Sequence, residues 1–259
     1  MIIFRKRKAA MDKPLVKIFP STSAMSLAAA ELFSEQVNEA GRKQHSVHIA
    51  LSGGSTPTTL FQLLAQSPYQ ETIPWQKIHF YWADERCVPP EDAESNYGQA
   101  WQSLLARVPV LTQNIHRVKG ELEPKAAAQD YINQLRQNAT GALSWPVLDC
   151  VLLGMGADGH TASLFPGQVN SAETTSPAIA VTADYAGRPA NRVTLTPLVF
   201  NSARHIIFLV SGENKAKAVS EVLFGPSDPL HLPAQRIRPV NGDVTWILDQ
   251  PAAAMVQVK

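Results

Sequence analysis

Short apolar runs that alternate with helix-like segments constrain the fold of this chain more than any other feature. The runs are rich in Val, Ile, Leu and Phe, and they lie at residues 16–19, 47–51, 78–83, 148–153, 206–210 and 244–248. Helices are expected between them, at residues 21–43, 58–65, 95–105, 124–137 and 213–223. This alternation predicts an α/β fold in which helices cover both faces of a mostly parallel central sheet.

Further strands are expected at residues 115–118, 178–181 and 192–196. No linker, repeat or low-complexity tract separates these segments, so we expect a single α/β domain over residues 16–259. Residues 1–15 carry a basic cluster and are expected to form a flexible N-terminal extension, in which Met1 and Met11 are alternative starts of translation.

The composition excludes several classes of partner. The formal net charge of +1 gives no field that would attract nucleic acid, and no apolar run approaches the roughly 20 residues that span a membrane. Cys87 and Cys150 have neither metal-binding nor redox spacing, and the sequence shows no secretory leader. We therefore expect a cytoplasmic protein with reduced thiols, no nucleic-acid partner and no membrane association.

One glycine-rich turn follows the fourth apolar run. Its sequence over residues 154–167, G-M-G-A-D-G-H-T-A-S-L-F-P-G, predicts a short helix after His160. The first six residues fit the dinucleotide-binding pattern G-x-G-x-x-G. However, Asp158 would bring a carboxylate close to a pyrophosphate, and the Pro-Gly pair ends the expected helix too early for that motif. We therefore interpret Gly156, Asp158 and Gly159 as a turn that presents His160 and backbone donors, suited to an oxyanion, to a ligand.

A second glycine-rich turn, S-G-G-S-T-P, follows an earlier apolar run and is typical of an anion site. Its glycines free backbone N–H groups, its hydroxyls add donors, and the N-terminus of the next helix adds positive potential. The lysine of a nucleoside triphosphate loop is absent, which favours a monophosphate. A capped turn without a ligand is the alternative. The expected phosphate-binding residues of this turn are Ser52, Gly53, Gly54, Ser55 and Thr56.

Charged residues follow two further runs. Asp84 and Arg86 belong to a D-E-R motif at the end of an expected strand. The planar guanidinium of Arg86 suits a phosphate, and Asp84 or Glu85 either orients it, acts as a base or forms a surface ion pair. Lys215 lies in the first turn of a helix, where the dipole disfavours a cation, so we expect it to reach an anion. Arg192 opens the run R-V-T-L-T and is expected to assist binding of the phosphate or an oxyanion.

His160 is the expected general base, because an imidazole titrates near neutral pH. The other histidines, among them His48, His79 and His116, are expected to be structural. No G-x-S-x-G elbow is present, so a base that activates water is favoured over a covalent acyl-enzyme. No second histidine or carboxylate stands at metal-ligand spacing from His160, so no metal is expected.

Together these motifs resemble the glucosamine-6-phosphate isomerase/6-phosphogluconolactonase family. The resemblance covers about residues 16–248, and it is most specific in the run D-G-H-T-A-S-L-F-P-G. Deaminase members of the family typically read D-E-Y and D-G-H-I-A-F-N-E-P-G where this chain has D-E-R and D-G-H-T-A-S-L-F-P-G. The chain follows the lactonase members at each of these divergences.

The resemblance implies a modified Rossmann-like fold and the hydrolysis of 6-phospho-D-glucono-1,5-lactone to 6-phosphogluconate in the oxidative pentose phosphate pathway. The implied catalytic residues are His160 and Asp84, and the implied phosphate ligands are residues 52–56, Arg86 and Lys215. No cofactor is implied. The partner is then a small phosphosugar lactone, bound by a monomer or a small homo-oligomer.

Two other functions stay open from the sequence. A deaminase or isomerase of amino-sugar phosphates would use the same phosphate turn and histidine. A non-catalytic sugar-phosphate sensor would usually carry a DNA-binding domain, and the residues before the first expected strand are too few for a helix-turn-helix. The sensor is therefore the less favoured alternative.

Overall fold

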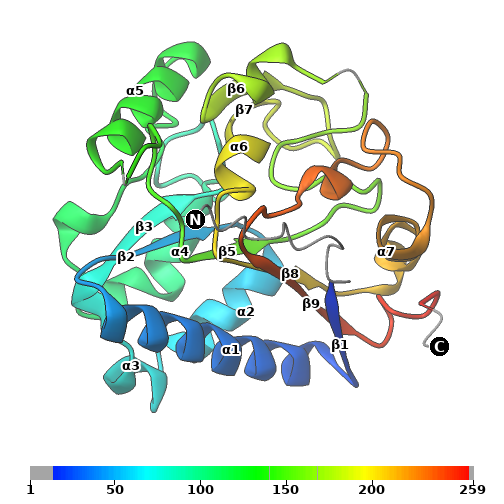
Figure 1. The fold of residues 1–259 in the computed structure, drawn as a ribbon, viewed down its shortest axis with the longest axis horizontal. Helices are drawn as coiled ribbons and strands as arrows, with labels where there is room; N and C mark the ends of the chain where they lie inside the picture. The colour runs from blue at the N-terminus through cyan, green and yellow to red at the C-terminus, as the bar shows by residue number, and fades with distance from the viewer. Residues whose placement is uncertain (1–13, 140, 168, 257–259) are drawn as a thin grey trace, which may run out of the picture.

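A parallel sheet forms the centre of the protein in the computed structural model, which describes residues 14–139, 141–167 and 169–256. Within these residues its six strands have the order β1-β9-β8-β5-β2-β3 (Figure 1). All neighbouring strands pair in parallel, which confirms the predicted fold class. The strands are β1 (Leu15–Phe19), β2 (Val47–Leu51), β3 (Ile78–Trp82), β5 (Cys150–Leu153), β8 (His205–Val210) and β9 (Asp243–Asp249).

Helices cover both faces of this sheet, with α1 and α2 on one side of it and α6 and α7 on the other (Figure 1). The α-helices are α1 (Thr22–Lys43), α2 (Ser55–Leu64), α3 (Tyr69–Thr72), α4 (Asn96–Ser103), α5 (Pro124–Gln137), α6 (Pro197–Phe200) and α7 (Ala216–Phe224). Short 3-10 helices are η1 (Trp75–Lys77), η2 (Leu105–Arg107), η3 (Thr112–Asn114), η4 (Ser171–Thr174), η5 (Glu213–Lys215) and η6 (Pro233–Arg236).

Alternate residues of each central strand enter opposite hydrophobic cores, because successive side chains of a strand point to opposite faces. In β5, Cys150 and Leu152 pack into the core that contains residues of α1 and α2. Val151 and Leu153 pack into the core that contains residues of α5, α6 and α7. Burial on both faces explains why the strands appear in the sequence as nearly continuous apolar runs.

A second, antiparallel sheet has the order β4-β7-β6 and was not predicted as a separate unit. It contains β4 (Asp84–Arg86), β6 (Ala178–Thr182) and β7 (Asn191–Leu195). The strands predicted in the later half of the chain are thus confirmed, but β6 and β7 form a hairpin outside the central sheet. Because β4 follows β3 after one residue, this hairpin is tied to the carboxyl edge of the parallel sheet.

The strand predicted at residues 115–118 is wrong. The segment makes one isolated parallel bridge, between Phe80 and Ile115. It then leaves the edge of β3, and Gly120 N–H donates to Val118 O at 3.1 Å in a tight turn.

The short helix predicted after His160 is also wrong. Thr161 Oγ1 donates to Gly154 O at 2.8 Å, and Ala162 has a φ of +48°, outside the right-handed helical region. The segment is therefore a compact turn. Of the expected extension, residues 1–13, with Met1 and Met11, lie outside the described residues, whereas Leu15 belongs to β1.

Candidate active site

The residues that the sequence singled out gather at the carboxyl edge of the parallel sheet, where neighbouring parallel strands end together. The turn at residues 52–56 follows β2, and β4 follows β3. The glycine-rich turn follows β5, and Lys215 follows β8. The chain therefore brings its phosphate-binding and catalytic candidates to one side of the molecule.

Asp158 and His160 form a hydrogen-bonded pair in the turn after β5. His160 Nδ1 lies 2.6 Å from Asp158 Oδ1, and the His160 backbone N–H donates to the same oxygen at 3.1 Å. Burial opposes ionisation, but the hydrogen bond and charge of His160 outweigh it, so the pKa of Asp158 is below its ordinary value. A carboxylate on Nδ1 favours the tautomer with a proton there, which leaves the Nε2 lone pair free to act as a base.

Glycine is required at position 156 of this turn. A Cβ there would overlap the His160 ring and the Asp158 carboxylate. Gly156 N–H donates to His160 O at 2.8 Å, and Gly159 N–H, at a φ of +79°, donates to Gly156 O at 3.1 Å. Since both N–H groups are used inside the turn, we assign these glycines to shaping it rather than to binding an oxyanion.

Two aromatic rings hold the His160 imidazole in place. The Phe165 ring lies 4.7 Å from it between centroids, and the Tyr185 ring meets it edge-on at 4.6 Å. Phe165 belongs to the same turn, whereas Tyr185 comes from the β6–β7 hairpin. The His160 side chain is 13% exposed, so part of the ring stays accessible.

The S-G-G-S-T-P turn presents a helix N-terminus to the same edge. Gly54 is the N-cap of α2 with a φ of +114°, and the first N–H groups of a helix have no intrahelical partner. Ser52 is not free to bind a ligand, because its buried hydroxyl donates to Leu152 O at 2.8 Å. Thr56 Oγ1 lies 2.8 Å from Ser211 Oγ, and Ser55 is exposed. Gly53 packs so closely against Asn96 that a Cβ would overlap its side chain.

Arg86 and Arg192 form the most unusual feature of the site. They are direct partners across the antiparallel strands β4 and β7, and they are only 7% and 2% exposed. Like charges opposite each other in a sheet destabilise it unless a counter-charge is present. Within the described residues, Arg86 Nε and Arg192 Nη2 are buried without a hydrogen-bond partner. Burial lowers the pKa of Arg192, and the charge of Arg86 lowers it further. The pair is thus suited to an anion.

Asp84 is buried at the start of β4. Its Oδ2 accepts a hydrogen bond from Ser163 Oγ at 2.7 Å, and its Oδ1 lies 3.4 Å from Asn96 Nδ2. In the described part of the chain it forms no ion pair with His160, whose carboxylate partner is Asp158. Because Ser163 lies in the turn that carries His160, the geometry gives Asp84 a positioning role.

Glu85, the middle residue of D-E-R, caps helix α4. Its carboxylate accepts N–H donors from Arg86, Asn96 and Tyr97 at 2.7 to 2.8 Å, and it also accepts the Ser95 hydroxyl at 3.2 Å. Burial raises the pKa of Glu85 to about 7, although these backbone donors oppose the shift. Its role is to fix the segment that follows β4.

Lys215 is the last residue of η5 and the N-cap of α7. Burial lowers its pKa, whereas the negative charge of Asp158 acts in the opposite direction. Lys215 therefore lies within electrostatic range of the Asp158–His160 pair and supplies a cation at the site.

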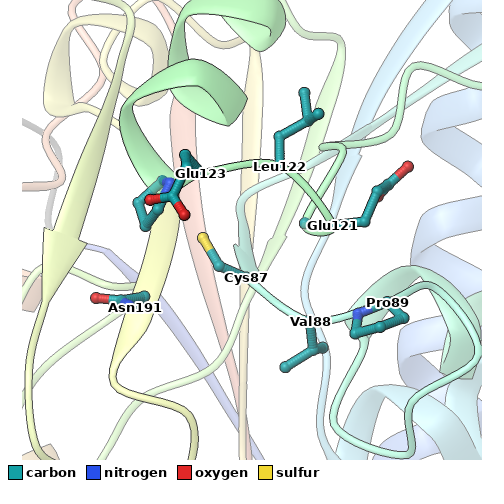
Figure 2. Close-up of a pocket in the computed structure, with 9 residues that line it drawn as sticks. Cys87, Val88, Pro89, Glu121, Leu122, Glu123 and Asn191 are labelled. Carbon is teal, nitrogen blue, oxygen red and sulfur yellow. The ribbon is translucent and has the colours of Figure 1, made fainter.

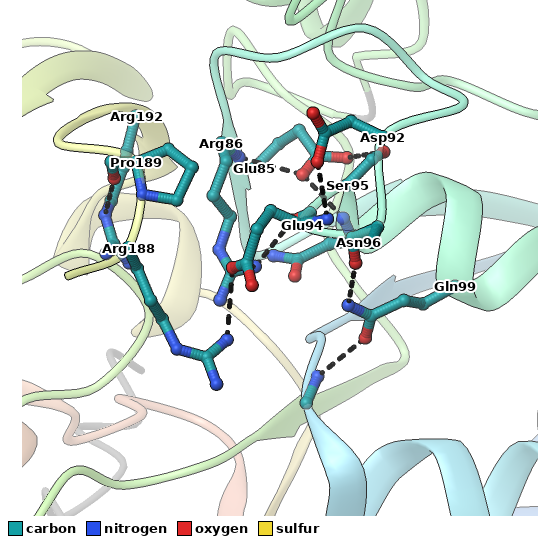
Figure 3. Close-up of polar contacts among 12 residues, drawn as sticks. Glu85, Arg86, Asp92, Glu94, Ser95, Asn96, Gln99, Arg188, Pro189 and Arg192 are labelled. Carbon is teal, nitrogen blue, oxygen red and sulfur yellow. Dashed lines mark hydrogen bonds and ion pairs between the residues drawn. The ribbon is translucent and has the colours of Figure 1, made fainter. Parts of the chain in front are cut away.

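Sequence reasoning missed Tyr185, Arg188 and Glu94. Arg188 Nη1 lies 3.2 Å from Glu94 Oε2, and Arg86 Nη1 lies 3.3 Å from the same oxygen (Figure 3). The turn of the hairpin is formed by Ala186 and Gly187, and Ala-Gly is not one of the pairs typical of such turns. No local signal indicates that this tip reaches the site.

The described residues contain no cluster of His, Cys, Asp and Glu fit to hold a metal ion. Over the same residues, no helix is long and apolar enough to cross a membrane.

A separate cleft of about 310 Å³ is lined by Cys87 and the turn before α5 (Figure 2). Burial, with the nearby carboxylates of Glu85 and Glu123, raises the pKa of Cys87 to about 11, so this thiol is not an activated nucleophile.

Comparison with known proteins identifies relatives over most of the chain. A family profile described as glucosamine-6-phosphate isomerases/6-phosphogluconolactonase matches residues 20–246. A 6-phosphogluconolactonase of Haemophilus influenzae is 41% identical over 212 residues, or 82% of this chain and 88% of that protein. A 6-phosphogluconolactonase of Aggregatibacter actinomycetemcomitans is 40% identical over 88% of this chain and 95% of that protein.

Solved structures share the fold. The structure of a protein described as devB has a TM-score of 0.84 at 40% identity, and it covers 94% of this chain and 99% of its own. The 6-phosphogluconolactonase from Trypanosoma brucei has a TM-score of 0.81 at 27% identity, over 95% and 99%. A monomeric glucosamine-6-phosphate deaminase, at 21% identity and a TM-score of 0.79 over 93% and 99%, shows the fold alone. This chain therefore belongs to the glucosamine-6-phosphate isomerase/6-phosphogluconolactonase family.

Proposed function

We propose that this protein hydrolyses 6-phospho-D-glucono-1,5-lactone to 6-phospho-D-gluconate. The observation that carries the proposal is a histidine–aspartate pair at the same sheet edge as a buried arginine pair with unused donors. The first can activate water and the second can hold a phosphate, and a phosphorylated lactone needs both. The relatives named 6-phosphogluconolactonase support this choice of substrate.

In the proposed reaction, His160 Nε2 takes a proton from water while the water oxygen attacks carbon C1 of the lactone. Asp158 holds the Nδ1 proton and stabilises the imidazolium that forms. The tetrahedral intermediate then breaks the bond between C1 and the ring oxygen, and His160 returns the proton to that oxygen. The products are a C1 carboxyl group and a free C5 hydroxyl. The lactone is an activated ester, so the scheme needs no cofactor.

The 6-phosphate of the substrate is held by Arg86 and Arg192 in this scheme. The two guanidinium groups supply positive charge in a buried setting, and one N–H group of each has no partner among the described residues. The N-terminus of α2, which follows β2, and Lys215, which follows β8, add positive potential at the same sheet edge. Asp84 contributes through Ser163, by fixing the turn that carries His160.

The decisive assay follows decay of the lactone. The lactone is generated from glucose 6-phosphate by its dehydrogenase, and its disappearance with and without the protein is recorded. We expect decay well above the spontaneous rate. Decay at the spontaneous rate would refute the proposal.

Parallel reactions separate the alternatives. Release of ammonia from glucosamine 6-phosphate would indicate a deaminase. Binding of a sugar phosphate without turnover of either substrate would indicate a sensor. We expect neither result.

A further inference from the structure

The tip of the β6–β7 hairpin has no role in the mechanism above, yet it lies against the site. It turns at Ala186 and Gly187, whose φ angles are +53° and +67°, and Arg188 N–H donates to Tyr185 O at 3.1 Å. Positive φ at both central residues is the geometry of a tight two-residue hairpin turn. Tyr185 and Arg188 are paired across the hairpin, so their side chains project from the same face.

Both side chains contact the site. The Tyr185 ring packs edge-on against His160. The Arg188 guanidinium binds Glu94 Oε2, which also accepts a hydrogen bond from Arg86 (Figure 3). One carboxylate oxygen thus bridges an arginine of β4 and an arginine of the hairpin.

The charges around Arg192 are unbalanced. The charges of Arg86 and Arg188, after the larger effect of burial, lower the pKa of Arg192, and those of Asp84 and Glu94 oppose them. The charges that act on Arg192 are thus two guanidinium groups and two carboxylates, and Arg192 itself adds a third guanidinium group. Buried charges without partners are costly, so the arrangement favours a further anion.

We propose that Arg188 makes the site selective for phosphorylated substrates, and that the Glu94 carboxylate occupies the place of the phosphate beside Arg86 and Arg188 until the substrate binds. The inference rests on the proposed function. An entering phosphate monoester replaces the Glu94 carboxylate as the partner of Arg86 and Arg188. The Glu94 side chain, which is 36% exposed, then turns to solvent. Arg188 then ties the hairpin tip to the substrate and keeps Tyr185 over His160.

This exchange discriminates between phosphorylated and unphosphorylated sugars. A phosphate monoester carries roughly −1.5 to −2 charges and three acceptor oxygens, so it can also serve the unused donors of Arg86 and Arg192. The pair it displaces is partly exposed, with Arg188 45% exposed, and such pairs contribute little. A sugar that ends in a hydroxyl lacks the charge to displace Glu94.

The test uses calorimetric titration of the full-length protein with 6-phosphogluconate and with gluconate. The variants are Arg188→Ala and Glu94→Gln. The control is Arg204→Ala, which removes an exposed arginine that pairs with Asp149 at the other end of the sheet. Thermal unfolding checks that each variant is folded. Lactone decay with the wild type runs alongside.

We expect Arg188→Ala to weaken 6-phosphogluconate binding about 10- to 100-fold and to leave gluconate binding unchanged. Glu94→Gln removes the competing charge, so it should preserve or strengthen 6-phosphogluconate binding. The inference is wrong if Arg188→Ala binds 6-phosphogluconate like the control or weakens both compounds equally. It is also wrong if Glu94→Gln weakens binding as Arg188→Ala does, because the Glu94–Arg188 ion pair would then only hold the hairpin in place. A wild type that neither binds 6-phosphogluconate nor accelerates lactone decay would instead refute the proposed function.

Discussion

A stack of three histidines lies at the amino-terminal end of β2 and β3, away from the proposed active site. His48 and His79 are neighbours across the two strands, with ring centroids 5.0 Å apart, and the His116 ring stacks on His79 at 5.2 Å. Burial and the neighbouring histidines lower the pKa of both His48 and His116 to about 4. The stack is therefore uncharged in the folded protein at neutral pH, as expected of structural histidines.

Acid should destabilise the fold through this stack. The folded-state pKa of His116 lies below its ordinary value of 6.5, so the unfolded chain binds the proton first. Stability is then lost as the pH falls from 6.5 towards 4. One pKa unit is worth about 1.4 kcal/mol, so the loss at pH 5 is about 2 kcal/mol for this residue. Glu85 acts with the opposite sign, because its raised pKa stabilises the folded protein as the pH falls from about 7 towards 4.5.

Comparison with the variant His116→Phe separates the two effects. Phenylalanine keeps a ring against Tyr81 but cannot take up a proton, whereas Glu85 is unchanged. Urea unfolding at pH 7 and pH 5 should show that the variant gains about 2 kcal/mol relative to the wild type at the lower pH. A substitution of the exposed His45 serves as the control. Equal pH dependence of the wild type and His116→Phe would refute the reasoning.

Three substitutions test the site itself. Asp158→Asn should lower kcat about 100-fold or more, because the His160 tautomer is no longer fixed; a kcat close to that of the wild type in the lactone assay would contradict the pairing. Arg86→Ala should raise KM about 10-fold or more with a smaller change in kcat, and an unchanged KM would exclude it as a phosphate ligand. Gly156→Ala should abolish activity, because its methyl group overlaps the His160 ring; an active variant would show that the turn can open.

The central sheet could be predicted because its strands are buried on both faces and therefore stand out as apolar runs. The antiparallel sheet could not be recognised as a unit, since β4 consists of the charged residues Asp84, Glu85 and Arg86. Their burial depends on pairing with β7, which is distant in the sequence, and on the N-terminus of α4, which lies about ten residues further along the chain. The spacing of apolar residues in the sequence does not indicate that a charged segment pairs in this way.

The site shows the same limit. Asp158 and His160 are two positions apart in the sequence, so the local motif alone placed them together. Arg188 and Glu94 are separated by 94 positions, and only the folded hairpin joins them. Ser52 is the opposite case. Its motif predicted a ligand for the hydroxyl, but in the structure this hydroxyl hydrogen-bonds to β5 and so joins β2 to β5.

The most direct test of the central claim is turnover of the lactone by His160→Ala, measured together with calorimetric binding of 6-phosphogluconate. If His160 activates the water, the variant should lose about 1000-fold or more of the acceleration over spontaneous opening and still bind the product like the wild type. Near-normal turnover by a variant that retains product binding would contradict the assignment of His160 as the base.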